Sequence, residues 1–201
     1  MRNAYLEIAT TPAVRAARER HDEANRYAGA EGALVNQRLG PTEAAFIAAR
    51  DSFYLASVSE DGWPYMQHRG GPVGVLRVID ETTVGFADYR GNKQYITVGN
   101  TSVNSRVSIF LMDYARKRRL KVYGTLDITT DAAFLAQVST DRYGAVIERG
   151  MRIRIAAFDW NCPQHITPRF TEAEVRQASL PLHERIAALE AEVAALRAAP
   201  G

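Results

Sequence analysis

The sequence predicts a mainly β protein, an antiparallel barrel or sandwich, with helices near both ends. Between Phe53 and Ile128, short segments rich in Val, Ile, Phe and Tyr alternate with Gly, Asp and Asn turns. These segments recur roughly every 8 to 12 residues, mostly without helices between them, which is typical of antiparallel β folds. The composition also supplies a core, because 46% of the 201 residues are hydrophobic. We therefore expect one domain with a terminal appendage.

Two helices are expected before the strands. Residues 12–30 are rich in Ala, Arg and Glu and predict an amphipathic helix that ends near Gly29. A second, short helix begins at Pro41 and carries Phe46 and Ile47 inward.

The strands follow as runs of β-branched and aromatic residues. Hairpin turns are expected at Asp61-Gly62 and at Asp80-Glu81, and residues 151–158 return to strand character after the main run. The six main predicted strands cover residues 53–59, 64–69, 75–79, 83–87, 106–113 and 120–128.

Two helices are expected to interrupt the strands. One lies between Lys93 and Asn104. The other covers residues 131–140 and is capped by Asp131, a residue type that favours the position before a helix.

The chain closes with a long helix over residues 171–199. Its apolar residues recur at spacings of 4, 3, 4 and 3, which is a heptad seam, flanked by charged residues such as Glu190 and Arg197. Either this helix packs on its own barrel, or it pairs with or lies across a second subunit. About two heptads are present, fewer than the 3 to 4 that identify a coiled coil. The seam consists of Leu182, Ile186, Leu189, Val193 and Leu196.

Composition excludes several classes of function. The formal charge of +2 is nearly balanced, and no aromatic residues interleave a basic surface, so we expect no nucleic-acid partner. The single Cys162 allows no intrachain disulfide and, with no secretory signal pattern, predicts a cytoplasmic protein. No apolar run is long enough to span a membrane. Zinc-ligand spacings and a dinucleotide-binding glycine motif are also absent from the sequence, so we expect no metal site and no Rossmann site.

The segment from Asp61 to Lys93 carries the candidate site. Its first half ends in polar residues followed by Gly70-Gly71-Pro72, and its second half opens from an apolar strand into a polar loop. Cationic side chains and glycines at the ends of neighbouring strands suit a planar ring that carries a phosphate, because glycine lets a ligand approach the backbone closely. The residues are Gln67, His68, Arg69 and Gly70 in the first half, and Asp88, Tyr89, Arg90, Asn92, Lys93 and the adjacent Gln94 in the second.

Strand geometry separates the candidates on the first segment. Side chains alternate between faces, so Gln67 and Arg69 share one face and His68 points to the other, where a structural role is expected. Arg69 either binds the ligand or pairs with a carboxylate. Lys93 either binds phosphate as a point charge or is simply solvated. Tyr89 either stacks on the ring or belongs to the core.

Four segments, in this order, resemble the flavin-binding split-barrel family related to pyridoxamine 5'-phosphate oxidase. They are FYLASVSEDGWPYMQHRGGP, VGFADYRGNKQY, NSRVSIFLMDY and LKVYGTLDI. A fifth, FDWNCPQHITPRF, is similar to a C-terminal signature of one subgroup. The resemblance implies a six-stranded antiparallel split β-barrel that forms a homodimer and binds FMN between the subunits.

The resemblance also implies roles for the candidate residues. The segment 67–71 would line the isoalloxazine and ribityl part of FMN, and Asn92-Lys93-Gln94, preceded by Asp88-Tyr89-Arg90, would hold its phosphate. Trp160 and Gln164 would close over the flavin from the partner subunit. The chain has Gly91-Asn92-Lys93 where the oxidase has a Ser-Arg-Lys run. FMN binding therefore carries over better than oxidation of pyridoxamine phosphate.

The function expected from the sequence is an FMN-binding flavoprotein, an oxidoreductase that transfers electrons between a reductant such as NAD(P)H and a small-molecule substrate or oxygen. No catalytic acid or base is identified. The alternatives are a flavin- or haem-binding module without turnover and a deazaflavin-dependent reductase. The expected organisation is a helical segment packed on the barrel (1–50), the FMN-binding barrel (51–170) and a C-terminal helix (171–201) that either contacts the partner or packs on its own barrel.

Overall fold

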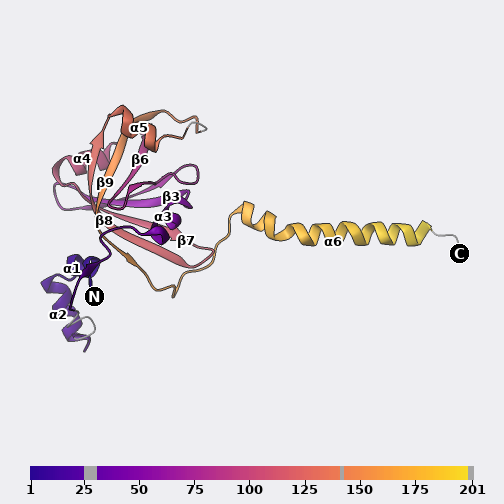
Figure 1. Ribbon diagram of the computed structural model, residues 1–201, viewed down its shortest axis with the longest axis horizontal. Coiled ribbons are helices and arrows are strands. Elements are labelled where there is room, and N and C mark those ends of the chain that lie inside the picture. Colours follow the sequence, from indigo (N-terminus) through magenta and orange to yellow (C-terminus); the bar gives the residue numbers. More distant parts are fainter. Residues whose placement is uncertain (25–30, 141–142, 199–201) are drawn as a thin grey trace. The chain divides into compact units, whose positions relative to one another are not determined.

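The computed structural model describes residues 1–24, 31–140 and 143–198 and contains a seven-stranded antiparallel sheet (Figure 1). The strands are hydrogen-bonded in the order β4-β3-β7-β8-β9-β6-β5. The chain divides into a larger unit, residues 1–113 with 118–163, and a smaller one, residues 114–117 with 164–201. The strands of the sheet are β3 (Ser52–Val58), β4 (Pro64–Gly70), β5 (Arg77–Asp80), β6 (Thr83–Tyr89), β7 (Arg106–Asp113), β8 (Arg118–Thr129) and β9 (Ile147–Trp160).

This sheet confirms the predicted mainly β fold with flanking helices. Seven strands are present instead of six, because β9 is 14 residues long and pairs with both β8 and β6. The strand predicted over residues 75–79 starts only at Arg77. Val75 and Leu76 are buried but lie in the loop before it, so burial rather than strand pairing explains their apolar character.

The sheet is rolled so that its two ends meet. Strand β4 is one edge and β6 lies next to the other edge, yet Arg69 of β4 reaches Asp88 of β6 at 2.6 Å. The rings of Phe53 in β3 and Phe86 in β6 are also 5.1 Å apart. Side-chain contacts, with no ladder of backbone hydrogen bonds between β4 and β6, therefore join the two ends of the barrel.

The core fills the interior of the roll with the alternate residues of each strand, as the two-residue period of a strand requires. On β7, for example, Val107, Ile109 and Leu111 are buried while the residues between them are less so. Fully buried side chains from β3, β6, β8 and β9 join them in one cluster.

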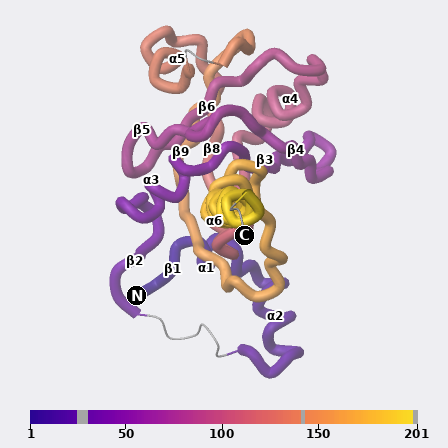
Figure 2. Tube along the Cα trace, turned by 90° about the vertical axis from the view of Figure 1, so that its right-hand side faces the viewer, coloured from indigo at the N-terminus to yellow at the C-terminus, as the bar shows by residue number. Residues whose placement is uncertain are grey.

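Two of the predicted helices cover this barrel. Helix α3 (Pro41–Ala48) buries Phe46 and Ile47 as expected. Helix α5 (Ala132–Val138) has the predicted cap, since Asp131 accepts a hydrogen bond of 2.8 Å from the backbone N–H of Phe134. Figure 2 shows α5 beside β6 and α4 (Ile96–Val103) on the side of β3.

The N-terminal helix prediction was wrong in its extent. Two helices, α1 (Ala4–Ala9) and α2 (Pro12–Arg20), replace one, and the predicted end near Gly29 lies outside the described residues. After α2 the backbone of Asp22 turns to a left-handed φ of 56°, which no helix can continue through. Two short parallel strands, β1 (Arg2–Asn3) and β2 (Leu34–Val35), accompany these helices.

The smaller unit consists chiefly of helix α6 (Glu172–Ala198), which confirms the long C-terminal helix. Thr171 and Glu174 form a capping box at its start: the backbone N–H of Thr171 donates to the Glu174 carboxylate at 2.8 Å, and the backbone N–H of Glu174 donates to the Thr171 hydroxyl at 3.2 Å. No residue of α6 is buried. None of the helices in the described parts of the chain has the length and apolar character that a membrane span requires.

Candidate functional site

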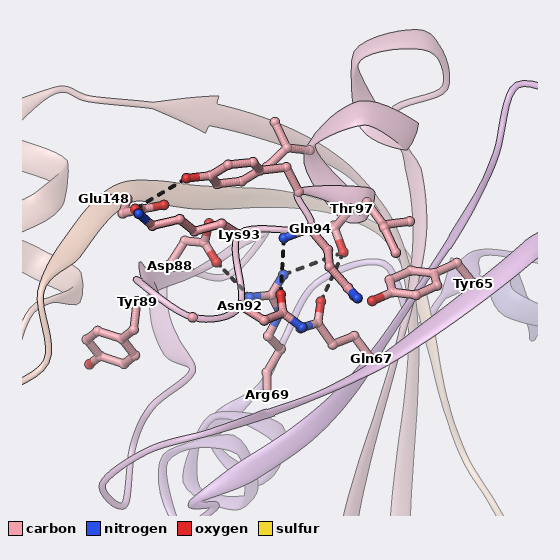
Figure 3. A pocket seen from close by; sticks show the side chains of 14 residues that line it. Tyr65, Gln67, Arg69, Asp88, Tyr89, Asn92, Lys93, Gln94, Thr97 and Glu148 are labelled. Carbon is pink, nitrogen blue, oxygen red and sulfur yellow. Dashed lines mark hydrogen bonds and ion pairs between the residues drawn. The ribbon is translucent and has the colours of Figure 1, made fainter.

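A cavity of about 170 Å³ lies where the end of β4, the end of β6 and the start of α4 come together (Figure 3). Strand β4 contributes Tyr65, Gln67 and Arg69, and β6 contributes Asp88 and Tyr89. The remaining lining residues are 91–98, from the loop and the first turn of α4, and Glu148 of β9. Seven of the residues predicted for the site therefore line one cavity: Gln67, Arg69, Asp88, Tyr89, Asn92, Lys93 and Gln94.

The alternation predicted for β4 is observed. Tyr65, Gln67 and Arg69 line the cavity (Figure 3), whereas His68, which lies between them in the strand, does not. The His68 ring packs edge to face on Tyr54, with 5.5 Å between the ring centroids. His68 therefore does not line the cavity, which agrees with the structural role expected from strand geometry. Gly70 does not line it either; a Cβ there would meet the His68 ring at 2.9 Å, so this glycine makes room for the histidine.

A buried carboxylate organises the cavity. Asp88 is only 6% exposed, and its Oδ1 accepts a 2.6 Å hydrogen bond from Arg69 Nη1. Its other oxygen, Oδ2, lies 3.3 Å from Arg149 Nε. The carboxylate pairing considered for Arg69 is thus present, and it tethers β4, β6 and β9 through their side chains.

A second carboxylate, that of Glu148, binds two guanidinium groups and a hydroxyl group. Glu148 accepts hydrogen bonds from Arg149 Nη2 at 2.7 Å, Arg90 Nε at 3.2 Å and the Tyr95 hydroxyl at 3.4 Å. Burial would raise the pKa of Glu148, but hydrogen bonds from Arg149, Arg90 and Tyr95 outweigh it, so the pKa lies below its usual value. Glu148 is therefore ionised at neutral pH.

The charges in and around the cavity do not cancel. Four cationic side chains face two carboxylates, which leaves a formal excess of two positive charges. Lys93 makes no ion pair with any residue in the described ranges. The carboxylates are Asp88 and Glu148, and the cations are Arg69, Arg90, Lys93 and Arg149.

The loop before α4 is held in an unusual backbone conformation. Lys93 and Tyr95 both have left-handed φ values, 59° and 52°, which non-glycine residues rarely adopt. Asn92 supports the turn, because its Oδ1 accepts a 3.1 Å hydrogen bond from the backbone N–H of Gln94. The side-chain oxygen of Asn92 is thus used within the loop.

This loop delivers the N-terminus of α4 to the cavity. Tyr95 precedes the helix and makes no side-chain hydrogen bond to its first turn. The first N–H groups of a helix have no partner within it, and the helix dipole adds positive potential there. Because Ile96, Thr97 and Val98 line the cavity next to Lys93, two sources of positive potential meet at one place.

The donors of this cavity fit an anionic ligand with a polar ring. Arg69 Nε is buried and has no hydrogen-bond acceptor among the described residues. The contacts between Thr97 Oγ1 and its neighbours are long, 3.5 Å to Arg69 Nη2 and 3.4 Å to Gln67 Oε1. Buried polar groups are usually well satisfied, so these groups are available to a ligand with acceptor atoms.

Three further predicted residues are not among those that line this cavity. The Trp160 indole N–H donates to Glu43 at 2.8 Å, and its ring packs on Phe46 at the other end of β9. Arg90 binds Glu148 but does not line the cavity, and Gln164, in the smaller unit, is exposed. The contact predicted for Trp160 and Gln164 is with a partner subunit, so it stays a prediction.

The Tyr89 ring packs against another aromatic ring of the protein, which favours a role in packing over a role in stacking on a ligand ring. Its ring lies 5.0 Å from that of Tyr143, and Figure 3 shows it pointing away from the Arg69–Asp88 pair. Burial raises its pKa, together with the neighbouring Tyr143.

Sequence reasoning missed several residues of the site, among them Tyr65, Thr97, Glu148 and Arg149. The signal for two of them was the adjacent charged pair Glu148-Arg149 at the start of β9. Arg149 is the cross-strand partner of Asp88, a register that the sequence pattern alone does not reveal.

The family model for pyridoxamine 5'-phosphate oxidase matches residues 39–160, more than half of the chain. The protein therefore belongs to the pyridoxamine 5'-phosphate oxidase family, with the split-barrel fold that the strand order and the closure of the sheet define. No curated protein matches the chain significantly.

Several solved structures are similar to the chain, and one of them supports this fold. HupZ from Group A Streptococcus is 18% identical with a TM-score of 0.51, and the match covers 66% of this chain and 100% of that one. An FMN-binding protein from Syntrophomonas wolfei subsp. wolfei is 16% identical with a TM-score of 0.44, covering 59% and 83%. An F420 reductase is 22% identical with a TM-score of 0.42, covering 57% and 94%. At these identities the likeness to HupZ shows the fold alone.

Removal of the Asp88 charge should destabilise the protein strongly. In Asp88→Asn, two largely buried guanidinium groups lose their carboxylate, and breaking a buried pair typically costs about 3–5 kcal/mol. Urea unfolding of the ligand-free protein measures the change. Asp127→Asn is the matched control: its partner Arg152 is 3.5 Å away and the Asp127 side chain is 65% exposed, so a loss below about 1 kcal/mol is expected. Equal losses in both variants would contradict the role of Asp88.

Glu148 should make stability depend on acid pH. Because its pKa is lowered on folding, its contribution is present above its usual pKa of 4.5 and is lost as the pH falls through the lower, folded-state value. Thermal unfolding between about pH 3 and 7 should therefore show a shallower acid loss for Glu148→Gln than for the wild type. Parallel profiles would show that the hydrogen bonds from Arg149, Arg90 and Tyr95 do not stabilise the charged form.

Proposed function

We propose that the protein binds FMN in this cavity and acts as an oxidoreductase. The observation that carries the proposal is the concentration of positive potential at one end of the barrel: an excess of two formal charges, the N-terminus of α4 and a lysine without an ion pair among the described residues. A phosphate ester carries about two negative charges at neutral pH, which matches this excess.

The residues divide into two groups along the cavity. Lys93 and the backbone N–H groups that open α4 would hold the phosphate, as a charged donor beside a helix N-terminus does elsewhere. Gln67 and Arg69 lie on β4 and would face the isoalloxazine ring. A guanidinium donor such as Arg69 Nε, placed near the N1–C2 edge, would favour negative charge on that ring.

When bound, the flavin would supply the redox chemistry, accepting a hydride or two electrons from a reductant such as NAD(P)H for transfer to a small-molecule substrate or to oxygen. The chain's own contribution is positioning and electrostatics. Asp88 fixes the Arg69 side chain through its hydrogen bond, and Glu148 does the same for Arg149. The described residues that line the cavity include no histidine, and the carboxylates among them are Asp88 and Glu148.

A homodimer is part of the proposal. Binding sites for molecules of drug size usually have volumes of about 300–1,000 Å³. The cavity of about 170 Å³ in one chain is smaller than that. A second chain that adds the Trp160–Gln164 segment, as the family resemblance implies, would complete the walls. The cytoplasmic location expected from the sequence stays a prediction.

The alternatives differ in how the cavity supports them. A flavin-binding module without turnover is favoured by the ion pairs of Asp88 and Glu148, because the oxygens of both carboxylates are already engaged by arginines. A haem usually requires an axial ligand such as histidine. Among the histidines, His68 is the closest in sequence to the cavity-lining residues. Its ring packs on Tyr54 and does not line the cavity. A deazaflavin would use the same phosphate donors as FMN.

The visible spectrum of the purified protein tests the cofactor. Two flavin bands and release of FMN on denaturation are the expected result. A protein that stays colourless and does not bind added FMN would overturn the proposal, and titration with deazaflavin or haem would then follow. Steady-state turnover with NADH or NADPH and an electron acceptor separates an oxidoreductase from a binding module.

Lys93→Ala should weaken FMN binding at least about tenfold, because a charge-assisted hydrogen bond contributes roughly 1.5–3 kcal/mol. Fluorescence titration of the apoprotein with FMN measures it. Lys117→Ala is a matched control, since Lys117 has a similar left-handed φ of 52° but does not line the cavity. An FMN affinity that is unchanged in Lys93→Ala, or lowered equally in both variants, would remove Lys93 from the phosphate site.

A further inference from the structure

Helix α6 presents an exposed apolar stripe. Leu182, Ile186, Leu189, Val193 and Leu196 are 66%, 52%, 42%, 44% and 70% exposed. A shallow groove runs along this face, and Glu190 and Arg197 belong to its lining together with Ile186, Leu189, Val193 and Ala194. A continuous apolar stripe with charged residues beside it is the pattern of a helix that packs on another helix.

We propose that this stripe pairs with the same stripe of a second copy of the chain, as a parallel, in-register two-stranded coiled coil over residues 182–198. The heptad positions are fixed by the spacing. Leucine occupies every d position, at 182, 189 and 196, and β-branched residues occupy the a positions, Ile186 and Val193. This combination favours two parallel strands over trimers and tetramers.

The charges beside the stripe agree with that partner. In a parallel dimer the g residue of one helix faces the e residue five positions later on the other. Arg185 at g then faces Glu190 of the second copy, and Glu192 at g faces Arg197. Both pairs are attractive, and the two-fold symmetry of the dimer makes each of them twice.

An antiparallel pair of α6 helices would either bring like charges together or bury fewer apolar residues. There a residues face d residues, and the register that uses Leu196 places Glu192 against Glu192 and Glu190 against Glu190, two repulsive contacts. The register that avoids this leaves Leu196 outside the interface. Charge and apolar burial therefore select the parallel arrangement together.

The outer face of α6 is consistent with a single partner. From residue 187 to 198, positions b, c and f are all alanine: 187, 188, 191, 194, 195 and 198. Alanine has the highest helix propensity and offers little apolar surface for a further helix. Pro181, the one proline inside α6, sits immediately before the seam and at an outward c position, so it does not interrupt the interface.

The seam is short. At 1.5 Å per residue, 17 residues span roughly 25 Å, which is marginal for an isolated coiled coil. Two chains already joined elsewhere would hold their α6 helices at a high effective concentration, and a short coil then forms readily. The coil would in this way reinforce the proposed homodimer, and it makes no use of the flavin site.

Cysteine cross-linking of the full chain tests the pairing and its register. In a Cys162→Ser background, Leu196→Cys places two d-position thiols opposite each other only in a parallel, in-register pair, where the Cα atoms come close enough for a disulfide. Mild oxidation should convert most of this variant to a disulfide-linked dimer. Ala195→Cys, one residue away at a c position, is the matched control and should remain largely unlinked. Equal cross-linking of both variants, or of neither, would overturn the proposal.

Charge exchange distinguishes the two orientations. Arg185→Glu alone should weaken the Leu196→Cys cross-link, since the introduced carboxylate would face Glu190, and adding Glu190→Arg should restore it. In an antiparallel pair Arg185 faces Glu192 instead, so the second substitution would give no rescue. The FMN content and the molecular mass of the same samples report the flavin site and the barrel dimer separately. A coiled coil that does not form can therefore be told apart from a protein that does not bind FMN.

Discussion

The ion pair between Arg69 and Asp88 is the interaction on which the site depends. It joins β4, at one edge of the sheet, to β6, next to the other edge, where the hydrogen-bonded ladder makes no connection. A rolled sheet that is not sealed by backbone hydrogen bonds needs side chains to hold its seam. Here the seam is held by a buried carboxylate that also meets Arg149 of β9. Because the cavity lies at this same seam, the contact that closes the barrel also positions the candidate ligand-binding residues.

The electrostatics of the cavity follow from that arrangement. Burying ionised groups is costly unless they are paired, and Asp88 and Glu148 pair most of the guanidinium groups near them. This pairing leaves an excess of positive charge. It also leaves a hydrogen-bond donor unused, since Arg69 Nε has no acceptor among the described residues. The strained loop at Lys93 and Tyr95 adds a helix N-terminus to the same side. Backbone strain of this kind is often retained where it serves a ligand. An anion at this point would offset the unbalanced charge.

Local patterns in the sequence were enough to predict the strands, the capped α5 and the alternation that turns Gln67 and Arg69 away from His68. Each of these depends on neighbours along the chain or on the two-residue period of a strand. Glu148 and Arg149 could not be found in this way, because their place beside Asp88 is set by the register between β6 and β9. The end of α2 at Arg20 was also missed, since helix-favouring composition continues beyond it and only the backbone turn at Asp22 stops the helix.

The barrel and helix α6 each favour association with a second chain, and the observations behind the two inferences are independent. The cavity has an excess of positive charge that would suit a phosphate, but its volume of about 170 Å³ is below the usual range for sites that bind molecules of drug size. A bound flavin would therefore need further walls, and a second chain would supply them. The stripe on α6 has leucines, β-branched residues and charges arranged for its own copy, and it is exposed in one chain. Both features are consistent with one closed, two-fold symmetric dimer, since a parallel coil has its two-fold axis along its length. In such a dimer the coil would keep the proposed two-chain site assembled at protein concentrations where the barrel interface alone would dissociate.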